Sequence, residues 1–215
     1  MDIKAVIFDL DGTLIDTEKI YRQVWPKALK DMGIEMKEEH YLAMRSLGRP
    51  FAPLKMKEWY GDDFDYDEAR RIRKKYFEEY IAVHGIQKKK GAIELLEYLR
   101  GQGVITAIAT ATDIERATQY MEMTELNGYF DKVISATMVK EGKPSPYVYL
   151  YACEQLGFKP EECIAVEDAP NGIKSAHDAG CKVIMVPDQS EPDEELLGMV
   201  SACVKSLDEI CGLLN

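Results

Sequence analysis

The 215-residue sequence predicts an α/β fold: a doubly wound, parallel, Rossmann-like sheet with an α-helical insert after the first strand. Short continuous apolar runs recur along the chain, as expected of strands that a parallel sheet buries on both faces. From residue 86 onward, amphipathic segments with helical spacing separate these runs, and this alternation is typical of a doubly wound sheet. The stretch 17–85 contains no such run, which predicts the insert.

Five runs are predicted to be strands, at residues 3–8, 104–109, 132–135, 163–166 and 182–186. A helix with an apolar stripe over 92–99 precedes the second strand and ends at the glycines of 101–103. Thr112 and Glu115 match a capping box that opens the next helix. Ser145 precedes a proline that suits the first position of a third helix, and a fourth helix begins at Asn171 and ends at Gly180.

Within the insert, the pattern predicts helices over 25–32 and 66–81 with a turn at 61–63. The chain then divides into a core domain of residues 1–16 and 86–215 and a helical domain of residues 17–85. A chain of this length buries a sizeable core without disulfides or structural metals.

Composition excludes several classes of partner. The net charge is −11, from 38 acidic and 27 basic residues, and such a field repels nucleic acid and anionic lipid. We see no signal peptide and no apolar run near the roughly 20 residues that span a bilayer. The five cysteines are odd in number and form no C-x-x-C pair, which favours reduced thiols in a cytoplasmic protein. A monomer is expected.

The most specific motif follows the first strand. Asp9 and Asp11 are two residues apart, so on an extended backbone both carboxylates project to the same side. Close carboxylates repel each other unless a cation or a shared proton compensates them. Asp11-Gly12 alone is also a common turn, but a second aspartate directly after a buried strand favours a functional site.

Three weaker motifs follow later strands. Thr110 and Ala111 end the second strand, where a hydroxyl and backbone N–H groups can bind phosphate, although Thr112 is adequately explained as a helix cap. Lys143 lies in a loop stiffened by prolines, where a lysine is usually a solvated charge. Glu167 and Asp168 follow the fourth strand, and either acid alone could be a turn residue or a helix cap.

Together the four motifs are far more specific than any one of them. The carboxyl ends of parallel strands meet at one edge of a sheet, where ligands bind. The assembled site would hold four carboxylates, a hydroxyl and an ammonium group. Hard oxygen ligands of this kind suit Mg²⁺, which bridges carboxylates to phosphate. A small phosphorylated ligand is therefore compatible with an acidic chain.

These motifs resemble those of the haloacid dehalogenase (HAD) superfamily, in the subgroup of phosphatases and β-phosphoglucomutases with a helical cap. Residues 9–18 (DLDGTLIDTE) are similar to its first motif, Thr110 to its second, and Gly142-Lys143-Pro144 to its third. The fourth motif is matched by residues 167–180, with Ala169 in place of the usual serine. Lys90-Gly91 replaces the usual Pro-Gly return to the core, and Tyr21 stands where mutases carry a histidine.

The resemblance implies a role for each residue of the core site. Asp9 would be the nucleophile that forms an aspartyl phosphate, and Asp11 the general acid and base. Mg²⁺ would be held by Asp9, the backbone carbonyl of Asp11 and Asp168, with Glu167 acting through water. Lys143 and Thr110 would offset charge on the phosphoryl oxygens, beside the backbone N–H of Ala111.

The cap would choose the substrate. Gly48 and Arg49 lie in a predicted cap loop, where Arg49 could meet a second anionic group or remain a solvated charge. Asn171, in the fourth motif, is a further candidate for substrate binding. The resemblance implies a Mg²⁺-dependent phosphatase of a small phosphomonoester, a sugar phosphate or related metabolite. The alternatives are a β-phosphoglucomutase-like phosphotransferase, against which Tyr21 counts, and a non-catalytic ligand-binding module, against which the intact acidic set counts.

Overall fold

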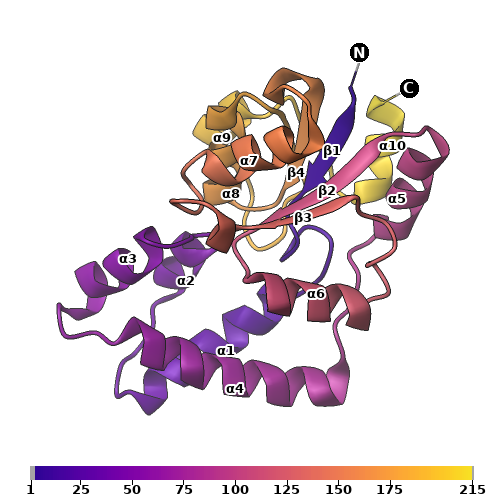
Figure 1. Ribbon diagram of the computed structural model, residues 1–215. Coiled ribbons are helices and arrows are strands. Elements are labelled where there is room, and N and C mark those ends of the chain that lie inside the picture. Colours follow the sequence, from indigo (N-terminus) through magenta and orange to yellow (C-terminus); the bar gives the residue numbers. More distant parts are fainter. Residues whose placement is uncertain (1–2, 215) are drawn as a thin grey trace.

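The computed structural model describes residues 3–214 and contains one six-stranded sheet in which every strand pair is parallel. The strand order is β3-β2-β1-β4-β5-β6, with β1 at the centre (Figure 1). The strands are β1 (Ala5–Phe8), β2 (Ile105–Thr110), β3 (Lys132–Ser135), β4 (Cys163–Glu167), β5 (Lys182–Met185) and β6 (Ala202–Cys203). The chain leaves β1 toward one side through β2 and β3 and toward the other through β4, as in a doubly wound sheet.

Helices cover both faces of the sheet, as Figure 1 shows. They are α5 (Ala92–Gly101), α6 (Ile114–Met123), α7 (Tyr147–Leu156), α8 (Pro170–Ala179), α9 (Glu194–Met199) and α10 (Ile210–Leu213). Side chains alternate along β1, so Val6 and Phe8 join the core beneath α5 and α10, whereas Ala5 and Ile7 join the core beneath α7 and α8. Short 3₁₀ helices at Ala136–Met138, Pro160–Glu162 and Leu207–Glu209 complete the connections.

Four helices form the insert: α1 (Glu18–Asp31), α2 (Glu38–Met44), α3 (Phe51–Tyr60) and α4 (Tyr66–His84). They lie beyond the carboxyl ends of the strands, and α1 packs along α4 (Figure 1). Tyr21 of α1 stacks on Phe77 of α4 with ring centroids 4.6 Å apart. The two connections to the core run together, because Asp16 N–H donates to the Gln87 carbonyl and Lys89 N–H to the Leu14 carbonyl. We propose residues 17–85 as a cap domain and residues 1–16 and 86–215 as the core domain.

The structure confirms the predicted fold class and places all five predicted strands within two residues of their expected ends. It adds β6, which at two residues is too short for a periodic signal, and it adds α2 and α3 to the cap. The five cysteines are unbridged. Among the described residues, no helix has both the length and the apolar character needed to cross a membrane.

The first cap helix, α1, begins at Glu18, seven residues before the expected start at 25, and α8 begins at Pro170, one residue before Asn171. Two further helix starts, those of α6 and α7, are also wrong. The N-cap of α6 is Asp113, whose carboxylate accepts the backbone N–H of Arg116, so Thr112 does not begin a capping box. The residue before α7 is Pro146, and Ser145 lies one position outside the expected cap. In both cases the helix begins one residue later than the sequence pattern indicates, which for Thr112 leaves the hydroxyl free for another partner.

Candidate active site

The carboxyl edge of the sheet brings the four predicted motifs together. Asp9 directly follows β1, and its backbone N–H donates to the carbonyl of Val166 on the neighbouring β4, 3.0 Å away. Thr110 is the last residue of β2, and Glu167 is the last residue of β4. The ladder of a parallel sheet therefore fixes the relative positions of side chains that lie far apart in the sequence.

Three carboxylates form the centre of this edge. One oxygen atom from each of Asp9, Glu167 and Asp168 lies within 4.8 Å of the other two. All three residues are buried, with at most 1% of their surface exposed. Burial raises the pKa of Asp9 and of Asp168 well above the usual range, and repulsion from the neighbouring carboxylates raises the pKa of both further.

Lys143 supplies the one ammonium group that the structure shows inside this cluster. Its Nζ donates to Asp9 Oδ1 at 2.5 Å and to Glu167 Oε1 at 2.6 Å. Burial alone would lower the pKa of Lys143, but the charges of Asp9 and Glu167 outweigh it and raise that pKa above its usual value. Tyr149 of α7 supports the pair, because its hydroxyl donates to Glu167 Oε1 and its ring centroid lies 5.2 Å from the ammonium nitrogen.

Within this cluster, two buried carboxylate oxygens have no hydrogen-bond partner: Asp9 Oδ2 and Glu167 Oε2. A buried acceptor without a hydrogen-bond partner destabilises the folded protein, and a buried carboxylate without a partner destabilises it more. A divalent cation with oxygen ligands would compensate both the orphaned atoms and the mutual repulsion. The donor set therefore fits Mg²⁺, with Asp9, Asp168 and Glu167 as the side chains within reach.

Glycines make room for the acids. A Cβ atom on Gly172 would lie 2.1 Å from Glu167 Oε2, and one on Gly12 would lie 2.6 Å from Asp168 Oδ2. Gly12 also adopts a φ of +86°, which other residues rarely adopt. The backbone at these glycines therefore packs directly against the carboxylates and restricts the rotation of their side chains.

Asp11 stands apart from the three clustered acids and is held by hydroxyl groups. The Thr17 hydroxyl donates to Asp11 Oδ1 at 2.6 Å, and the Thr112 hydroxyl donates to Asp11 Oδ2 at 2.7 Å. The backbone N–H of Thr112 in turn donates to the Thr110 hydroxyl at 3.0 Å. The hydroxyl expected to cap α6 therefore orients an acid of the site.

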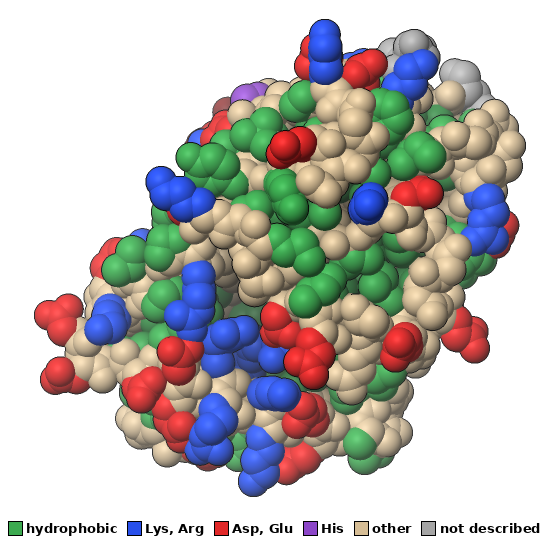
Figure 2. All heavy atoms as spheres, in the orientation of Figure 1, with side chains coloured by type: hydrophobic (Ala, Val, Ile, Leu, Met, Phe, Trp, Pro, Cys, Tyr) green, Lys and Arg blue, Asp and Glu red, His purple; other side chains and the backbone are tan. Residues whose placement is uncertain are grey.

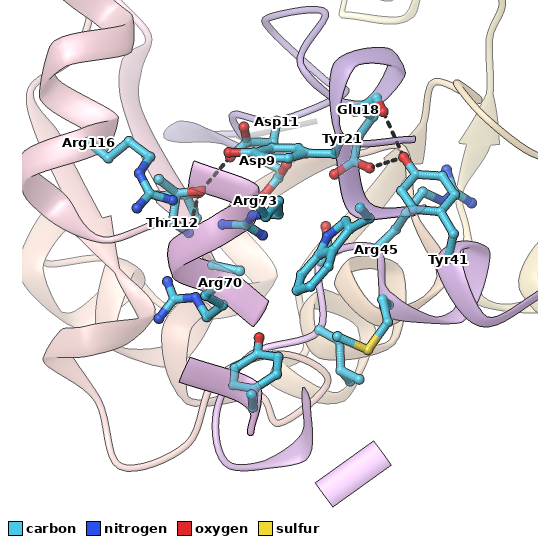
Figure 3. A pocket seen from close by; sticks show the side chains of 17 residues that line it. Asp9, Asp11, Glu18, Tyr21, Tyr41, Arg45, Arg70, Arg73, Thr112 and Arg116 are labelled. Carbon is cyan, nitrogen blue, oxygen red and sulfur yellow. Dashed lines mark hydrogen bonds between the residues drawn. The ribbon is translucent and has the colours of Figure 1, made fainter. Parts of the chain in front are cut away.

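A pocket with about 670 Å³ of free space, including its open mouth, lies between this edge and the cap. The core contributes Asp9, Asp11, Thr110, Ala111, Thr112 and Arg116. Most of the cap side chains in the lining are aromatic, apolar or arginine: the cap contributes Glu18, Tyr21, Trp25, Tyr41, Met44, Arg45, Ser46, Leu47, Tyr66, Arg70 and Arg73. Figure 3 labels Glu18, Tyr21, Tyr41, Arg45, Arg70 and Arg73 among them.

A family model described as haloacid dehalogenase-like hydrolase matches residues 3–180. This chain belongs to that family. It is 30% identical to Hexitol phosphatase A of Escherichia coli (strain K12), covering 98% of this chain and 94% of that protein. It is also 30% identical to a phosphorylated carbohydrates phosphatase of Thermotoga maritima, covering 85% and 84% of the two chains.

Among solved structures, CbbY from Rhodobacter sphaeroides in complex with phosphate aligns with a TM-score of 0.80 at 26% identity. The alignment covers 97% of this chain and 96% of that one. The phosphatase relatives and the family model together identify the chain as an enzyme, a phosphatase of the haloacid dehalogenase-like family. It resembles the subgroup predicted from the four motifs.

The structure separates the predicted site residues of this phosphatase into two groups. Asp9, Asp11, Thr110 and Ala111 line the pocket. Beneath it, Lys143, Glu167 and Asp168 are buried against Asp9. Gly48, Arg49 and Asn171 form the second group, which is outside the described pocket lining.

The second group instead connects cap and core or faces outward. The backbone N–H of Gly48 donates to the Lys143 carbonyl at 2.8 Å, and a Cβ on Gly48 would lie 2.7 Å from Gly142. The Asn171 amide donates to the carbonyls of Ala43 and Arg45. Arg49 forms an ion pair with Asp67, and about half of its side chain is exposed.

Several pocket residues have no separate signal in the sequence. Arg45 of the cap is 2% exposed, and its guanidinium nitrogen lies 3.5 Å from Asp168 Oδ2. The Tyr41 hydroxyl donates a hydrogen bond to a carboxylate oxygen of Glu18, 2.6 Å away. Burial raises the pKa of Glu18 to about 7, although this hydrogen bond opposes the shift. Glu18 and Thr17 belong to the first motif and could have been chosen from it, whereas Arg45 lies in a stretch with no recognisable pattern.

Proposed function

We propose that this phosphatase is Mg²⁺-dependent and hydrolyses a small phosphomonoester, a sugar phosphate or related metabolite, through an aspartyl-phosphate intermediate on Asp9. The observation that carries the proposal is the buried cluster of Asp9, Glu167 and Asp168 beside Lys143, with Asp9 Oδ2 unpartnered. The named carbohydrate and hexitol phosphatases among its relatives support the substrate class.

Asp9 is positioned to attack. It lines the pocket, and its Oδ1 is held by Lys143 while Oδ2 is unpartnered. The Lys143 ammonium reduces the repulsion between this carboxylate and an incoming phosphate dianion. The Thr110 hydroxyl and the backbone N–H of Ala111 lie at the same edge and would donate to phosphoryl oxygens.

Asp11 serves as the acid and base. It lines the pocket beside Asp9, and the hydroxyls of Thr17 and Thr112 fix both of its oxygens. In the first half-reaction it gives a proton to the departing alkoxide. In the second it takes a proton from the water that attacks the aspartyl phosphate.

Asp9, Asp168 and the backbone carbonyl of Asp11 would hold Mg²⁺ directly, and Glu167 would reach it through water. The cation would offset the charge of the crowded carboxylates and of the transferring phosphoryl oxygens. We further propose that the enzyme is a cytoplasmic monomer without nucleic-acid or membrane partners, consistent with its net charge of −11.

Tyr21 favours hydrolysis over intramolecular phosphoryl transfer. A mutase must keep water from the aspartyl phosphate while its intermediate reorients, which requires protonation to be coupled to cap closure. Tyr21 is buried with its hydroxyl 3.2 Å from that of Tyr120, and burial raises its pKa further above 10. It cannot titrate near neutrality as a histidine can, so water reaches the phosphoenzyme.

The test is a panel of phosphorylated sugars and polyols assayed for orthophosphate release with Mg²⁺ and with a chelator. We expect Mg²⁺-dependent release from a subset of the panel and none after chelation. Hydrolysis that survives chelation would overturn the metal assignment. With β-glucose 1-phosphate and a trace of the 1,6-bisphosphate, we expect orthophosphate as the main product, and rapid formation of glucose 6-phosphate would instead identify a mutase.

A further inference from the structure

The loop that follows β5 bonds to the cap and to the linker that returns from the cap to the core. We call residues 188–190 of this loop the cap-contact loop. Lys89 of the returning linker donates to Asp188 Oδ1 at 2.5 Å, and a guanidinium nitrogen of Arg22 on α1 donates to Gln189 Oε1 at 3.1 Å. The Gln189 amide also donates to Asp188 Oδ2 at 3.0 Å, so both contacts belong to one hydrogen-bonded network.

Ser190, the third residue of the cap-contact loop, bonds to an arginine that lines the active-site pocket. One terminal guanidinium nitrogen of Arg45 donates to the Ser190 hydroxyl, and the other lies 3.5 Å from Asp168 Oδ2. The Arg45 side chain is only 1% exposed. A side chain of the cap is therefore enclosed between two segments of the core.

The three cations bonded to this loop differ from other cations of the cap. Figure 2 shows Lys and Arg side chains lying beside Asp and Glu side chains over the cap. Lys55 pairs with Glu58 and Arg71 pairs with Glu68, each within one helix. Such pairs support a helix locally and do not influence where the cap lies on the core. The cations bonded to the cap-contact loop instead join segments that are far apart in the sequence.

The position of the cap depends on contacts of this kind. The proposed cap is an insertion at residues 17–85, so two linkers are its covalent connections to the core. Two neutral hydrogen bonds also join the domains, from the Gly48 N–H to the Lys143 carbonyl at 2.8 Å and from the Gly142 N–H to the Arg49 carbonyl at 2.7 Å. Hydrogen bonds from cationic groups are stronger than neutral ones, so the cap-contact loop should contribute much of the holding energy.

We infer that the cap-contact loop positions the cap for the phosphatase reaction: its three residues bond to cations of the cap and linker and thereby hold the cap side of the pocket over Asp9 and Asp11. The inference rests on the proposed function, because it assumes that the substrate lies between these two sides. Residues 188–190 are outside the described pocket lining. They are therefore positioning residues, which act through the cap and not on the substrate.

Hydrogen exchange tests the contact without any turnover. In Gln189→Ala/Ser190→Ala, the amides of Gly48 and Gly142 should exchange about tenfold faster than in the wild type, because two bonds to guanidinium groups no longer oppose separation of cap and core. The amide of Ala69, which bonds within the cap, should exchange at the wild-type rate. Unchanged exchange at Gly48 and Gly142, or equal acceleration at Ala69, would overturn the inference.

Single variants assign the effect to the named contacts. Glu191→Gln is the matched control, because Glu191 is the next residue of the chain and is exposed, whereas the three cations bond to the residues before it. Ser190→Ala should accelerate exchange at Gly48, and Ser190→Thr, which keeps the hydroxyl, should restore the wild-type rate. Acceleration in Glu191→Gln as large as in Ser190→Ala would contradict the assignment.

A double-mutant cycle isolates the contact between the loop and α1. Arg22→Ala and Gln189→Ala should each accelerate exchange at Gly48. The two substitutions remove the same hydrogen bond, so the combined variant should accelerate exchange by less than the product of the two single effects. A combined effect equal to that product would show that the two side chains act independently and would overturn this contact.

Steady-state kinetics with para-nitrophenyl phosphate and Mg²⁺ separate positioning from a merely structural role. In Gln189→Ala/Ser190→Ala, KM should rise about threefold or more while kcat stays within about twofold, because bound substrate selects the positioned cap. A fall in kcat at unchanged KM would overturn the positioning role. If the wild type hydrolyses no phosphomonoester, the proposed function fails, and the exchange rates still decide whether this loop holds the cap.

Discussion

Carboxylates dominate the core side of the site, whereas the cap side carries arginines and aromatic rings, and the two sides are held in different ways. Asp9, Lys143, Glu167 and Asp168 are at most 1% exposed and bond across strands and loops. Arg70 and Arg73 are half-buried on a single helix and rest against aromatic rings. The sheet fixes the groups that need exact mutual placement, whereas a helix surface can change its side chains without disturbing that placement. We therefore propose that the chemistry lies with the core and substrate selection with the cap.

The largest expected effect comes from Asp9→Asn, which keeps the side-chain shape and removes the attacking charge. Turnover of para-nitrophenyl phosphate with Mg²⁺ should fall on the order of 10³-fold or more. Circular dichroism should show an unchanged fold. Asp178→Asn, which alters an exposed aspartate paired with Lys174, is the control and should keep wild-type turnover. Near-native turnover of a folded Asp9→Asn protein would rule out the nucleophile assignment.

Lys143→Met tests whether the core side depends on its one observed ammonium group. The change leaves Asp9 and Glu167 buried without their cation and should lower the free energy of unfolding by about 3–5 kcal/mol in the absence of metal. Urea denaturation measures it. Lys140→Met, in the same loop but with its side chain 77% exposed, should change stability by less than about 0.5 kcal/mol. Similar values for both variants would contradict the buried network.

The two proposed metal ligands, Asp168 and Glu167, should contribute differently to Mg²⁺ affinity. Asp168→Ala should raise the Mg²⁺ concentration for half-maximal activity more than Glu167→Gln, if Asp168 binds directly and Glu167 through water. For Glu167→Gln, which changes a ligand that acts through water, the expected loss in Mg²⁺ affinity is about 10-fold to 100-fold. Titration of Mg²⁺ against activity gives the ranking, and the opposite order would exchange the two roles.

Thr112→Val should have a smaller effect, because it removes one of two hydroxyls that orient Asp11. We expect kcat to fall by about tenfold, with a greater loss for alkyl phosphates than for aryl phosphates, whose leaving groups need little protonation. Thr118→Val is the matched control, since the Thr118 hydroxyl donates to a backbone carbonyl within α6. Equal losses on both substrate types would argue against a role through Asp11.

The smallest expected effect is that of Arg49→Ala. Arg49 pairs with Asp67 at the surface, and exposed ion pairs contribute little. We expect less than about a twofold change in kcat/KM for the best substrate. A loss of about tenfold or more in kcat/KM would place substrate recognition at the cap loop of residues 48–50 and would weaken the contrast between the two sides.

The fold and the core cluster could be predicted from the sequence because their signals are local. A buried run ending in Asp9 and Asp11 indicates both a strand and the edge at which it stops, and parallel topology then brings Thr110 and Glu167 to the same edge. At Thr112 the sequence pattern indicates a helix cap, because a hydroxyl before a helix has the same pattern whether it bonds to the backbone or to Asp11.

The cap shows what sequence alone leaves open. Residues 70–75 of α4 contain five basic side chains, and nothing in their order separates those that line the pocket from those that face solvent. The sequence determined that a helix lies there and that it is basic. Packing against α1 decided that Arg71 faces solvent beside Glu68, whereas Arg73 lies over Tyr21 and Trp25 in the pocket. The reason is physical: helical periodicity defines faces, but only contacts between helices distant in the chain decide which face is covered.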